Sequence, residues 1–259
     1  MIVPKYYSKF QCIADKCHHT CCAGWEIDVD PDSLERYKDI PDISSHVKDG
    51  SYILEAEERC PFLRDDGLCR MILTYGEDML CNICKDHPRF RNYMGGEEYM
   101  GLGLCCEEAC RLILNDTERF ELVPPRPLPF FIDTVQDDES PVSELLDGIY
   151  PDDISCAERA EEYLKFERLD DKWTKLLEDL KKSPVDPSDS AALMDKDDRR
   201  FRNLIIYFLY RHPGNIFLAC DAARLIADIC VSSGESLEEV ARMYSSEIEY
   251  SDENLQYFE

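Results

Sequence analysis

The chain has 259 residues, enough for one large domain or two small ones with a hydrophobic core that needs no disulfides. The 55 acidic and 29 basic residues give a formal charge of −26, which disfavours nucleic acid as a partner. No apolar run is long enough to span a bilayer, and the opening MIVPKYYSKF lacks the features of a signal peptide. We therefore expect a cytoplasmic protein without a membrane or nucleic-acid partner.

Two short helices are predicted in the first half of the chain. Asp30 and Pro31 have the residue types that begin a helix, because Asp caps the first turn and Pro fits its first position. The segment CCEEACRLIL (105–114) has the apolar spacing of a second helix and places Cys106 in its first turn. Exposed N–H groups at that end of a helix favour the thiolate form of cysteine.

Strand signals are few. YILEAE (52–57) and YMGLGL (99–104) are the segments most like strands, and we expect them to form a small pair. The glycines within 94–103 favour a hairpin turn, and they do not have the spacing of a dinucleotide-binding loop.

A proline-rich acidic segment, 121–154, follows. Its four prolines within six positions exclude a helix interior or a central strand, so we interpret it as an extended connector. We expect this connector to pack in part through Phe130, Phe131 and Ile132.

The remainder has helical patterning. Ser155 and Glu158 form a predicted capping box, and Ser236 with Glu239 repeats it. RRFRNLIIYFLYRH (199–212) is apolar on almost every side, which predicts a central buried helix. Cys220 and Cys230 fit this region as ordinary buried residues.

Together these patterns predict a mainly α protein with little β structure. The expected regions are a cysteine-rich metal- or cluster-binding part over 1–120, a connector over 121–154 and a helical part over 155–259.

The chain has 14 cysteines, and eleven of them lie between positions 12 and 110. They fall into four groups: Cys12, Cys17, Cys21 and Cys22; Cys60 and Cys69; Cys81 and Cys84; and Cys105, Cys106 and Cys110. A disulfide framework is disfavoured in a reducing compartment, and this density is unlike a random set of core cysteines. Clustered thiolates suit zinc or an iron–sulfur cluster, and the spacing alone leaves both open.

At these groups the sequence resembles the flagellin lysine N-methylase (FliB) family, within the wider YkgJ-type group of cysteine-cluster proteins. The matching motifs are F-x-C-x4-C-x3-C-C-x-G-W at 10–25, CPFL-x4-L-C at 60–69, C-x2-HPRF at 84–90 and L-x-C-x-E-A-x-R-L-I-L at 104–114.

The resemblance implies an iron–sulfur cluster, which is [4Fe–4S] in that family. It also implies methyl transfer from S-adenosylmethionine to lysine side chains of a protein substrate, with flagellin as the expected substrate. By position, the implied ligands are Cys12, Cys17, Cys21, Cys22, Cys60, Cys69, Cys84 and Cys106. Cys81, Cys105 and Cys110 stand where we expect Ser or Ala in the family, so they are additional thiols here.

Two residues are predicted to contact S-adenosylmethionine. Trp25 offers an aromatic face to a sulfonium, although packing over the cluster, where the ring keeps water away, is the simpler explanation. Arg89 suits a carboxylate. No catalytic base is assigned, because Glu26, Asp28 and Tyr99 are all available and sequence does not rank them. The alternative function is a non-enzymatic protein that chelates iron or zinc through the same cysteines.

Overall fold

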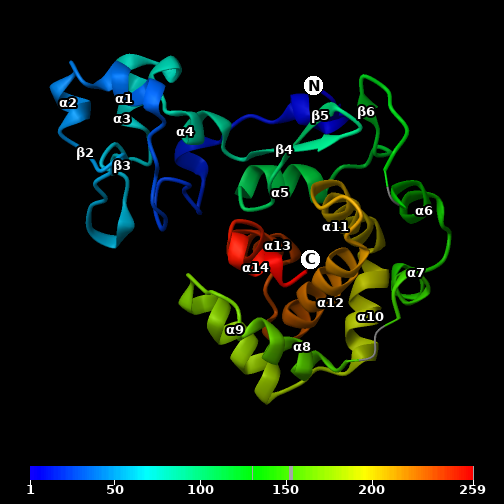
Figure 1. The fold of residues 1–259 in the computed structure, drawn as a ribbon. Coiled ribbons are helices and arrows are strands. Elements are labelled where there is room, and N and C mark those ends of the chain that lie inside the picture. The colour runs from blue at the N-terminus through cyan, green and yellow to red at the C-terminus, as the bar shows by residue number, and fades with distance from the viewer. Residues whose placement is uncertain (130, 152–153, 259) are drawn as a thin grey trace. The chain divides into compact units, whose positions relative to one another are not determined.

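The computed structural model describes residues 1–129, 131–151 and 154–258, and it divides into two compact units. Unit 1 comprises Met1–Phe10 and Arg91–Glu259, and unit 2 comprises Gln11–Phe90 (Figure 1). These boundaries differ from the regions predicted from sequence. The cysteine-rich unit ends at Phe90 rather than near position 120, and residues 91–120 fall in the same unit as the C-terminal helices.

Unit 2 is built from short elements joined by loops. In chain order they are η2 (Ala14–Lys16), α1 (Pro31–Tyr37), α2 (Pro41–Ser44), β2 (Val47–Lys48), β3 (Ser51–Tyr52), η3 (Ala56–Glu58), α3 (Arg70–Tyr75), η4 (Glu77–Met79) and α4 (Asn82–Asp86). The predicted start at Asp30 and Pro31 is confirmed, since the Asp30 carboxylate accepts a hydrogen bond from the Ser33 backbone N–H at 3.0 Å. Antiparallel strands β2 and β3 form the two-stranded sheet of this unit.

The predicted pairing of 52–57 with 99–104 is wrong. β3 pairs instead with β2, its neighbour in sequence, and the strand β5 (Glu97–Leu102) pairs with β4 (Arg89–Met94). The hairpin between β4 and β5 is the turn predicted from the glycines: Gly95 and Gly96 have φ of 58° and 79°, where glycine carries no steric penalty. Local hairpins thus replace a long-range pair.

Unit 1 holds the long helices. Besides β4 and β5 it contains β1 (Val3–Pro4), η1 (Lys5–Lys9), α5 (Glu107–Leu114), β6 (Leu122–Val123), α6 (Ile132–Asp137), α7 (Val142–Ile149), α8 (Cys156–Tyr163), α9 (Asp171–Lys182), α10 (Pro187–Lys196), α11 (Asp198–Arg211), α12 (Ile216–Ser233), α13 (Leu237–Tyr244), the π-helix η5 (Ser245–Glu249) and α14 (Asp252–Gln256). Antiparallel β1 and β6 join the N-terminus to the segment after α5.

Helix α12 forms the centre of unit 1. It contacts α8, α9, α10, α11 and α13, which surround it in Figure 1. The predicted buried helix is α11, whose residues from Leu204 to Tyr210 are all buried. The capping box at Ser155 is present with both of its hydrogen bonds, which fixes where α8 begins. Cys220 and Cys230 are buried in α12, as expected.

The proline-rich segment is only partly extended. The connector prediction is wrong over α6 and α7, two amphipathic helices that begin after the prolines and pack on the long helices. Ile132 and Val135 are buried in α6, whereas Phe131 is 49% exposed and Phe130 lies outside the described residues. The prolines precede these helices, so they do not interrupt them.

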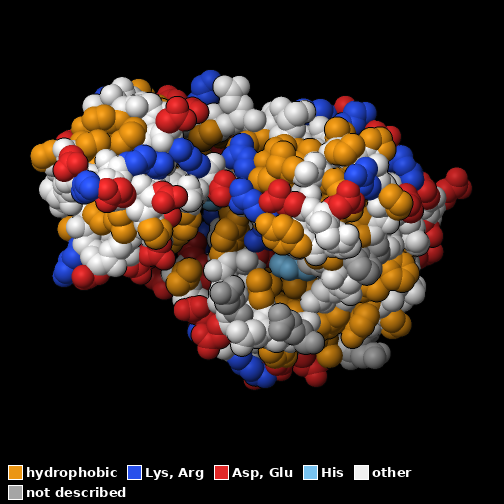
Figure 2. All heavy atoms as spheres, turned by 45° about the horizontal axis from the view of Figure 1, so that its top comes forward, with side chains coloured by type: hydrophobic (Ala, Val, Ile, Leu, Met, Phe, Trp, Pro, Cys, Tyr) orange, Lys and Arg blue, Asp and Glu red, His pale blue; other side chains and the backbone are white. Residues whose placement is uncertain are grey.

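The mainly α fold predicted from sequence is confirmed. Of the helices in the part of the chain that the structure describes, none combines the length and apolar character needed to cross a lipid bilayer. Figure 2 shows acidic side chains intermixed with lysines and arginines over the face in view, in keeping with exposed ion pairs such as Arg119 with Asp133.

Candidate functional site

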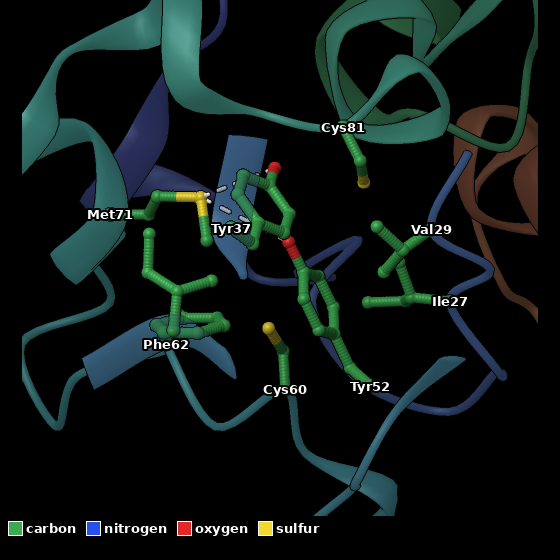
Figure 3. Close-up of a cluster of buried hydrophobic side chains, with 9 residues drawn as sticks. Ile27, Val29, Tyr37, Tyr52, Cys60, Phe62, Met71 and Cys81 are labelled. Carbon is green, nitrogen blue, oxygen red and sulfur yellow. Dashed lines mark hydrogen bonds between the residues drawn. The ribbon is translucent and has the colours of Figure 1, made fainter. Parts of the chain in front are cut away.

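Five cysteines gather around one buried cluster of side chains in unit 2. Cys60 and Cys81 lie inside it with 5% and 0% of their surface exposed, and Cys22, Cys69 and Cys84 pack against it. Figure 3 shows the thiols of Cys60 and Cys81 pointing into the cluster from opposite sides. We call these five residues the thiol core.

Backbone pairing brings three of these cysteines to the cluster. The Cys60 N–H donates to the Cys22 carbonyl oxygen at 2.8 Å, next to an isolated bridge between Ala23 and Arg59. A second bridge pairs Leu63 with Cys69 and closes the loop CPFLRDDGLC. The turn of that loop contains Gly67 at a φ of 78°, a conformation that side chains with a Cβ seldom adopt.

Cys81 and Cys84 come from the start of α4. Cys81 precedes the first residue of this helix and Cys84 lies within it. The Asn82 N–H donates to the Asp30 carboxylate at 2.8 Å, so the residue that caps α1 also fixes the beginning of α4. The two helices therefore hold the C-x2-C segment against the rest of the cluster.

The electrostatics of the thiol core differ from one cysteine to another. A hydrogen bond from Cys84 lowers the pKa of Cys81 to about 6 and raises the pKa of Cys84. Burial raises the pKa of Cys60 to about 12 and also raises that of Cys69. A hydrogen bond from Cys21 lowers the pKa of Cys22 to about 7. Cys81 and Cys22 are therefore the thiols that become anions most readily.

Three of the predicted ligands lie in unit 2 outside the thiol core. Cys12 and Cys21 are exposed, and Cys17 is half-buried. The Cys12 sulfur accepts a hydrogen bond from the Ala14 N–H at 3.4 Å, and the Cys17 thiol donates to the His19 carbonyl oxygen at 3.3 Å. This segment is held by turns and η2 rather than by the apolar cluster.

Cys106 belongs to unit 1, where it occupies the N-cap position of α5 without a capping hydrogen bond from its side chain, instead of lying in the first turn as predicted. The loop before it is fixed by Tyr207, whose hydroxyl accepts from the Leu104 N–H at 3.2 Å and donates to the Glu249 carboxylate at 2.7 Å. Both Tyr207 and Glu249 are buried. A polar contact from α11 thus sets the position of the cysteine loop.

The donor chemistry of the thiol core fits a thiophilic metal. All fourteen cysteines are among the described residues, and none of them is joined in a disulfide. Within those residues, no group of three or more His, Cys, Asp or Glu side chains is arranged to hold a metal ion. The fit therefore rests on the type and gathering of the donors, since soft thiolates select zinc and iron–sulfur clusters.

The two residues predicted to bind S-adenosylmethionine both lie in unit 2. Trp25 is half-buried against the thiol core, its indole N–H donates to the Cys21 carbonyl oxygen at 2.8 Å, and its ring lies 6.4 Å from that of His87. Arg89 donates to the Lys85 carbonyl oxygen at 3.2 Å. Burial, and secondarily the charge of Arg89, lowers the pKa of His87 to about 4, so this imidazole is neutral near pH 7.

A cavity of about 440 Å³ adjoins the loop that carries Cys60 and Cys69. It is lined by Phe62, Leu63, Arg64 and Arg70 among others, and neither Trp25 nor Arg89 lines it. Its volume lies in the range of small-molecule sites. Sequence reasoning missed this cavity, because its lining comes together only when the loop folds back on α3.

Sequence reasoning also set aside Cys81, which the structure places at the centre of the thiol core. The signal that could have found it is the C-x2-C spacing with Cys84, which sets two thiols one helical turn apart. Of the three carboxylates and phenols considered as bases, Glu26 and Asp28 are exposed in unit 2 and Tyr99 is buried in unit 1.

The chain is similar to curated bacterial proteins over 134 residues, which cover 46% of it. It is 29% identical to a lysine-N-methylase of Salmonella typhimurium over 33% of that protein, and 29% identical to a lysine-N-methylase of Salmonella choleraesuis over the same share. It is 28% identical to the flagellar biosynthetic protein FliU of Salmonella muenchen over 79% of that protein. These similarities confirm the resemblance that the cysteine motifs predicted.

The chain spans about a third of the length of the lysine-N-methylases it matches. No family model matches it. No solved structure matches it either.

Proposed function

Since the chain is similar to lysine-N-methylases, we propose that it transfers methyl groups from S-adenosylmethionine to lysine side chains of a protein, with flagellin as the first substrate to test. The observation that carries the proposal is this similarity, which coincides with five thiols gathered around one core in unit 2. The similarity to FliU, a flagellar biosynthetic protein, supports flagellin as the substrate.

We propose an iron–sulfur cluster as the resident group, [4Fe–4S] first and zinc as the alternative. Cys22, Cys60, Cys69 and Cys84 are the predicted ligands that the thiol core already brings together. When bound, a cluster supplies thiolate-ligated iron that can act as a redox centre. The cysteines contribute the anionic donors and the apolar cluster around them limits access of water.

The methyl transfer itself needs a neutral lysine amine in line with the methyl carbon. The new bond joins lysine Nζ to that carbon, the bond from the carbon to the sulfonium sulfur breaks, and S-adenosylhomocysteine leaves as a neutral thioether. One proton must leave the amine. Asp28, exposed and hydrogen-bonded to the Ser51 hydroxyl at 2.7 Å, is a carboxylate on the same unit that can take up this proton.

In our proposal Trp25 and Arg89 bind the methyl donor. An indole face attracts a sulfonium by a cation–π interaction of about 0.5–2 kcal/mol, and a guanidinium suits the donor's carboxylate. The hydrogen bond from the Trp25 indole to the Cys21 carbonyl oxygen holds the ring beside the cysteine segment. His87, kept neutral by burial, adds no competing positive charge next to this ring.

The test is to incubate the anaerobically purified protein with S-adenosylmethionine and flagellin and to follow lysine masses by mass spectrometry. We expect increments of one methyl group or more at lysines. No increment with a fully loaded protein would refute the methylase proposal. Calorimetry of S-adenosylmethionine with the Trp25→Ala and Arg89→Ala proteins tests the proposed binding residues. Arg64→Ala is the control, because Arg64 lines the 440 Å³ cavity instead.

A second function is favoured by one observation: the similarity to the lysine-N-methylases covers only about a third of those proteins, whereas the cysteines gather in unit 2. Gathered cysteines are also consistent with a non-enzymatic iron- or zinc-binding protein. That function predicts a loaded metal site, no heat of binding with S-adenosylmethionine and no methylated product. The same calorimetry therefore separates the two functions.

A further inference from the structure

We propose that a cavity in unit 1 binds a lysine-bearing segment of the protein substrate. This inference rests on the proposed function for the identity of that substrate, and it deepens the function by assigning a docking site in the unit that does not hold the thiol core. The cavity has a volume of about 730 Å³ and is lined only by residues of unit 1. A volume of this size is typical of ligand-binding sites.

Three parts of unit 1 form the walls of this cavity. They are the loop after α5, the segment from the end of α6 to the start of α7, and the end of α10 with the first half of α11. Helix α6 packs on α11, and α7 packs on α10 (Figure 1). The Phe120 N–H donates to the Gln136 side-chain oxygen at 3.1 Å. The Arg202 guanidinium donates to the Val135 carbonyl oxygen at 2.6 Å, so hydrogen bonds join the walls to one another.

The positive groups of the lining already have acceptors. The lining contains five carboxylates and three guanidinium groups: Glu118, Asp138, Glu139, Asp195, Asp198, Arg119, Arg199 and Arg202. Arg202 donates to Asp198 at 2.7 Å, and Arg119 donates to Asp133 at 2.9 Å. Arg199 donates to a backbone carbonyl oxygen at 2.6 Å. The cavity is therefore poorly suited to an anionic ligand.

Three carboxylates of the lining are available to a cation. Asp138, Glu139 and Asp195 are exposed, and none of them forms an ion pair with another residue that the structure describes. Asp138 accepts a hydrogen bond from the Ser140 N–H at 2.8 Å. Asp195 accepts from the Ser143 N–H at 3.0 Å and from its hydroxyl at 2.9 Å. These bonds orient two of the carboxylates and leave acceptor capacity on each oxygen.

A lysine side chain matches both the charge and the apolar part of the lining. Its ammonium is a compact cation with three donors, which suits several carboxylates at once. Its four-carbon stem can lie along the apolar side chains that line the cavity, Phe120, Pro141 and Ile206. The formal charge of −26 attracts a lysine-rich surface before contact is made. Charge complementarity therefore favours a lysine-bearing segment as the occupant.

Fluorescence anisotropy of a short labelled peptide of alternating lysine and alanine tests this docking site. The peptide is titrated with the full chain at about 20 mM sodium chloride and without S-adenosylmethionine, because salt screens exposed ion pairs. We expect the Kd to rise about tenfold in the triple variant Asp138→Asn, Glu139→Gln, Asp195→Asn. The amides keep the shape and one oxygen acceptor of each side chain, so the fold is retained.

The matched control removes the same charge from α9 and α14, which do not line the cavity. It is the triple variant Asp171→Asn, Asp179→Asn, Glu253→Gln, in which all three altered residues are exposed. We expect its Kd to stay within about twofold of that of the unaltered protein. A second control uses the unaltered protein with a peptide whose lysines are acetylated. Acetylation removes the charge but keeps the stem, so this peptide should not bind.

Two results would overturn the inference: equal changes of Kd in the two triple variants, or equal binding of the acetylated peptide. In the first case net charge alone would explain binding, and in the second case apolar contact would explain it. The assay contains no methyl donor, so its failure is distinguishable from failure of the proposed methylase. Methylated flagellin without peptide binding would overturn this inference alone. Peptide binding lost in the first triple variant, without any methylated product, would support the docking site and refute only the methylase.

Discussion

The buried side chains of this protein differ sharply in how much each contributes to the free energy of unfolding. The clearest case is Arg159 in unit 1, which is 2% exposed and lies between two buried aspartates. Its guanidinium donates to Asp221 at 2.8 Å and to Asp228 at 3.2 Å, and Ser190 donates to Asp228 at 2.6 Å. The network joins α8 and α10 to the central helix α12.

Replacing Arg159 with Met is expected to destabilise the protein by about 3–5 kcal/mol, because two carboxylates lose their buried cation. Urea unfolding followed by circular dichroism measures this change. The control is Arg119→Met, which removes a cation from the exposed aspartates Asp133 and Asp137 and should barely move the midpoint. Equal shifts in the two variants would contradict the assigned role of the buried network.

His87 provides a prediction on pH. Its pKa is lowered from 6.5 to about 4 by burial, so between these values the unfolded chain binds more protons than the folded chain. The contribution of His87 to stability is therefore present above pH 6.5 and falls as pH drops toward 4, by about 1–3 kcal/mol. His87→Phe, which keeps a ring beside Trp25, should lose less stability than the unaltered protein between pH 7 and pH 5. Parallel pH profiles of the two proteins would rule this out.

At the scale of elements, helix starts were the most predictable features of the chain. Asp30, Ser155 and Ser236 all accept the capping hydrogen bonds expected of them, because a cap depends on residues within one turn. The strand pairs were not predictable in the same way. Pairing across the chain depends on which segments meet in space, and short strands such as β2 and β3 carry little pattern of their own.

Asp30 joins two elements, so its replacement tests how α1 and α4 depend on each other. Asp30→Ala removes acceptors for both the Ser33 and the Asn82 N–H groups, and we expect a loss of about 1–3 kcal/mol in unit 2. Hydrogen exchange should show faster exchange in both α1 and α4. Ser155→Ala, which removes a cap in unit 1 at a cost of about 1 kcal/mol, should leave those helices unchanged. Faster exchange in α1 alone would disprove the link.

At the scale of the whole molecule, the sequence was sufficient to predict a mainly α fold and a cysteine-rich first half. It was not sufficient to place the unit boundary or to rank the thiols. Cys81 was set aside because its burial in the same cluster as Cys60 depends on residues that are remote from it in sequence. The resemblance named ligands by position, whereas burial and contacts distinguish the thiol core from Cys12 and Cys17.

The formal charge of −26 gives a prediction for encounter with substrate. A protein surface rich in lysines should be attracted to this chain, and salt screens that attraction over about 8–10 Å at 0.1–0.15 M. If the proposed flagellin methylation is correct, its kcat/KM falls as sodium chloride is raised from about 20 to about 200 mM. A short peptide with one lysine, one acidic residue and no net charge serves as the control and should respond much less. An equal response in both substrates would show that net charge plays no part.

Unit 1 is formed from both ends of the sequence. The eighty residues from Gln11 to Phe90 are therefore an insertion in the sequence of unit 1 and not an extension at one of its ends. Both ends of that segment are anchored, so its disordered state keeps less conformational freedom than a free tail of the same length. Removal of the metal proposed for this unit would then loosen a segment tethered at both ends without detaching the helices of unit 1. Evolution could likewise alter, shorten or delete this insertion while the surrounding helices continue to fold, which makes the cysteine unit an exchangeable module.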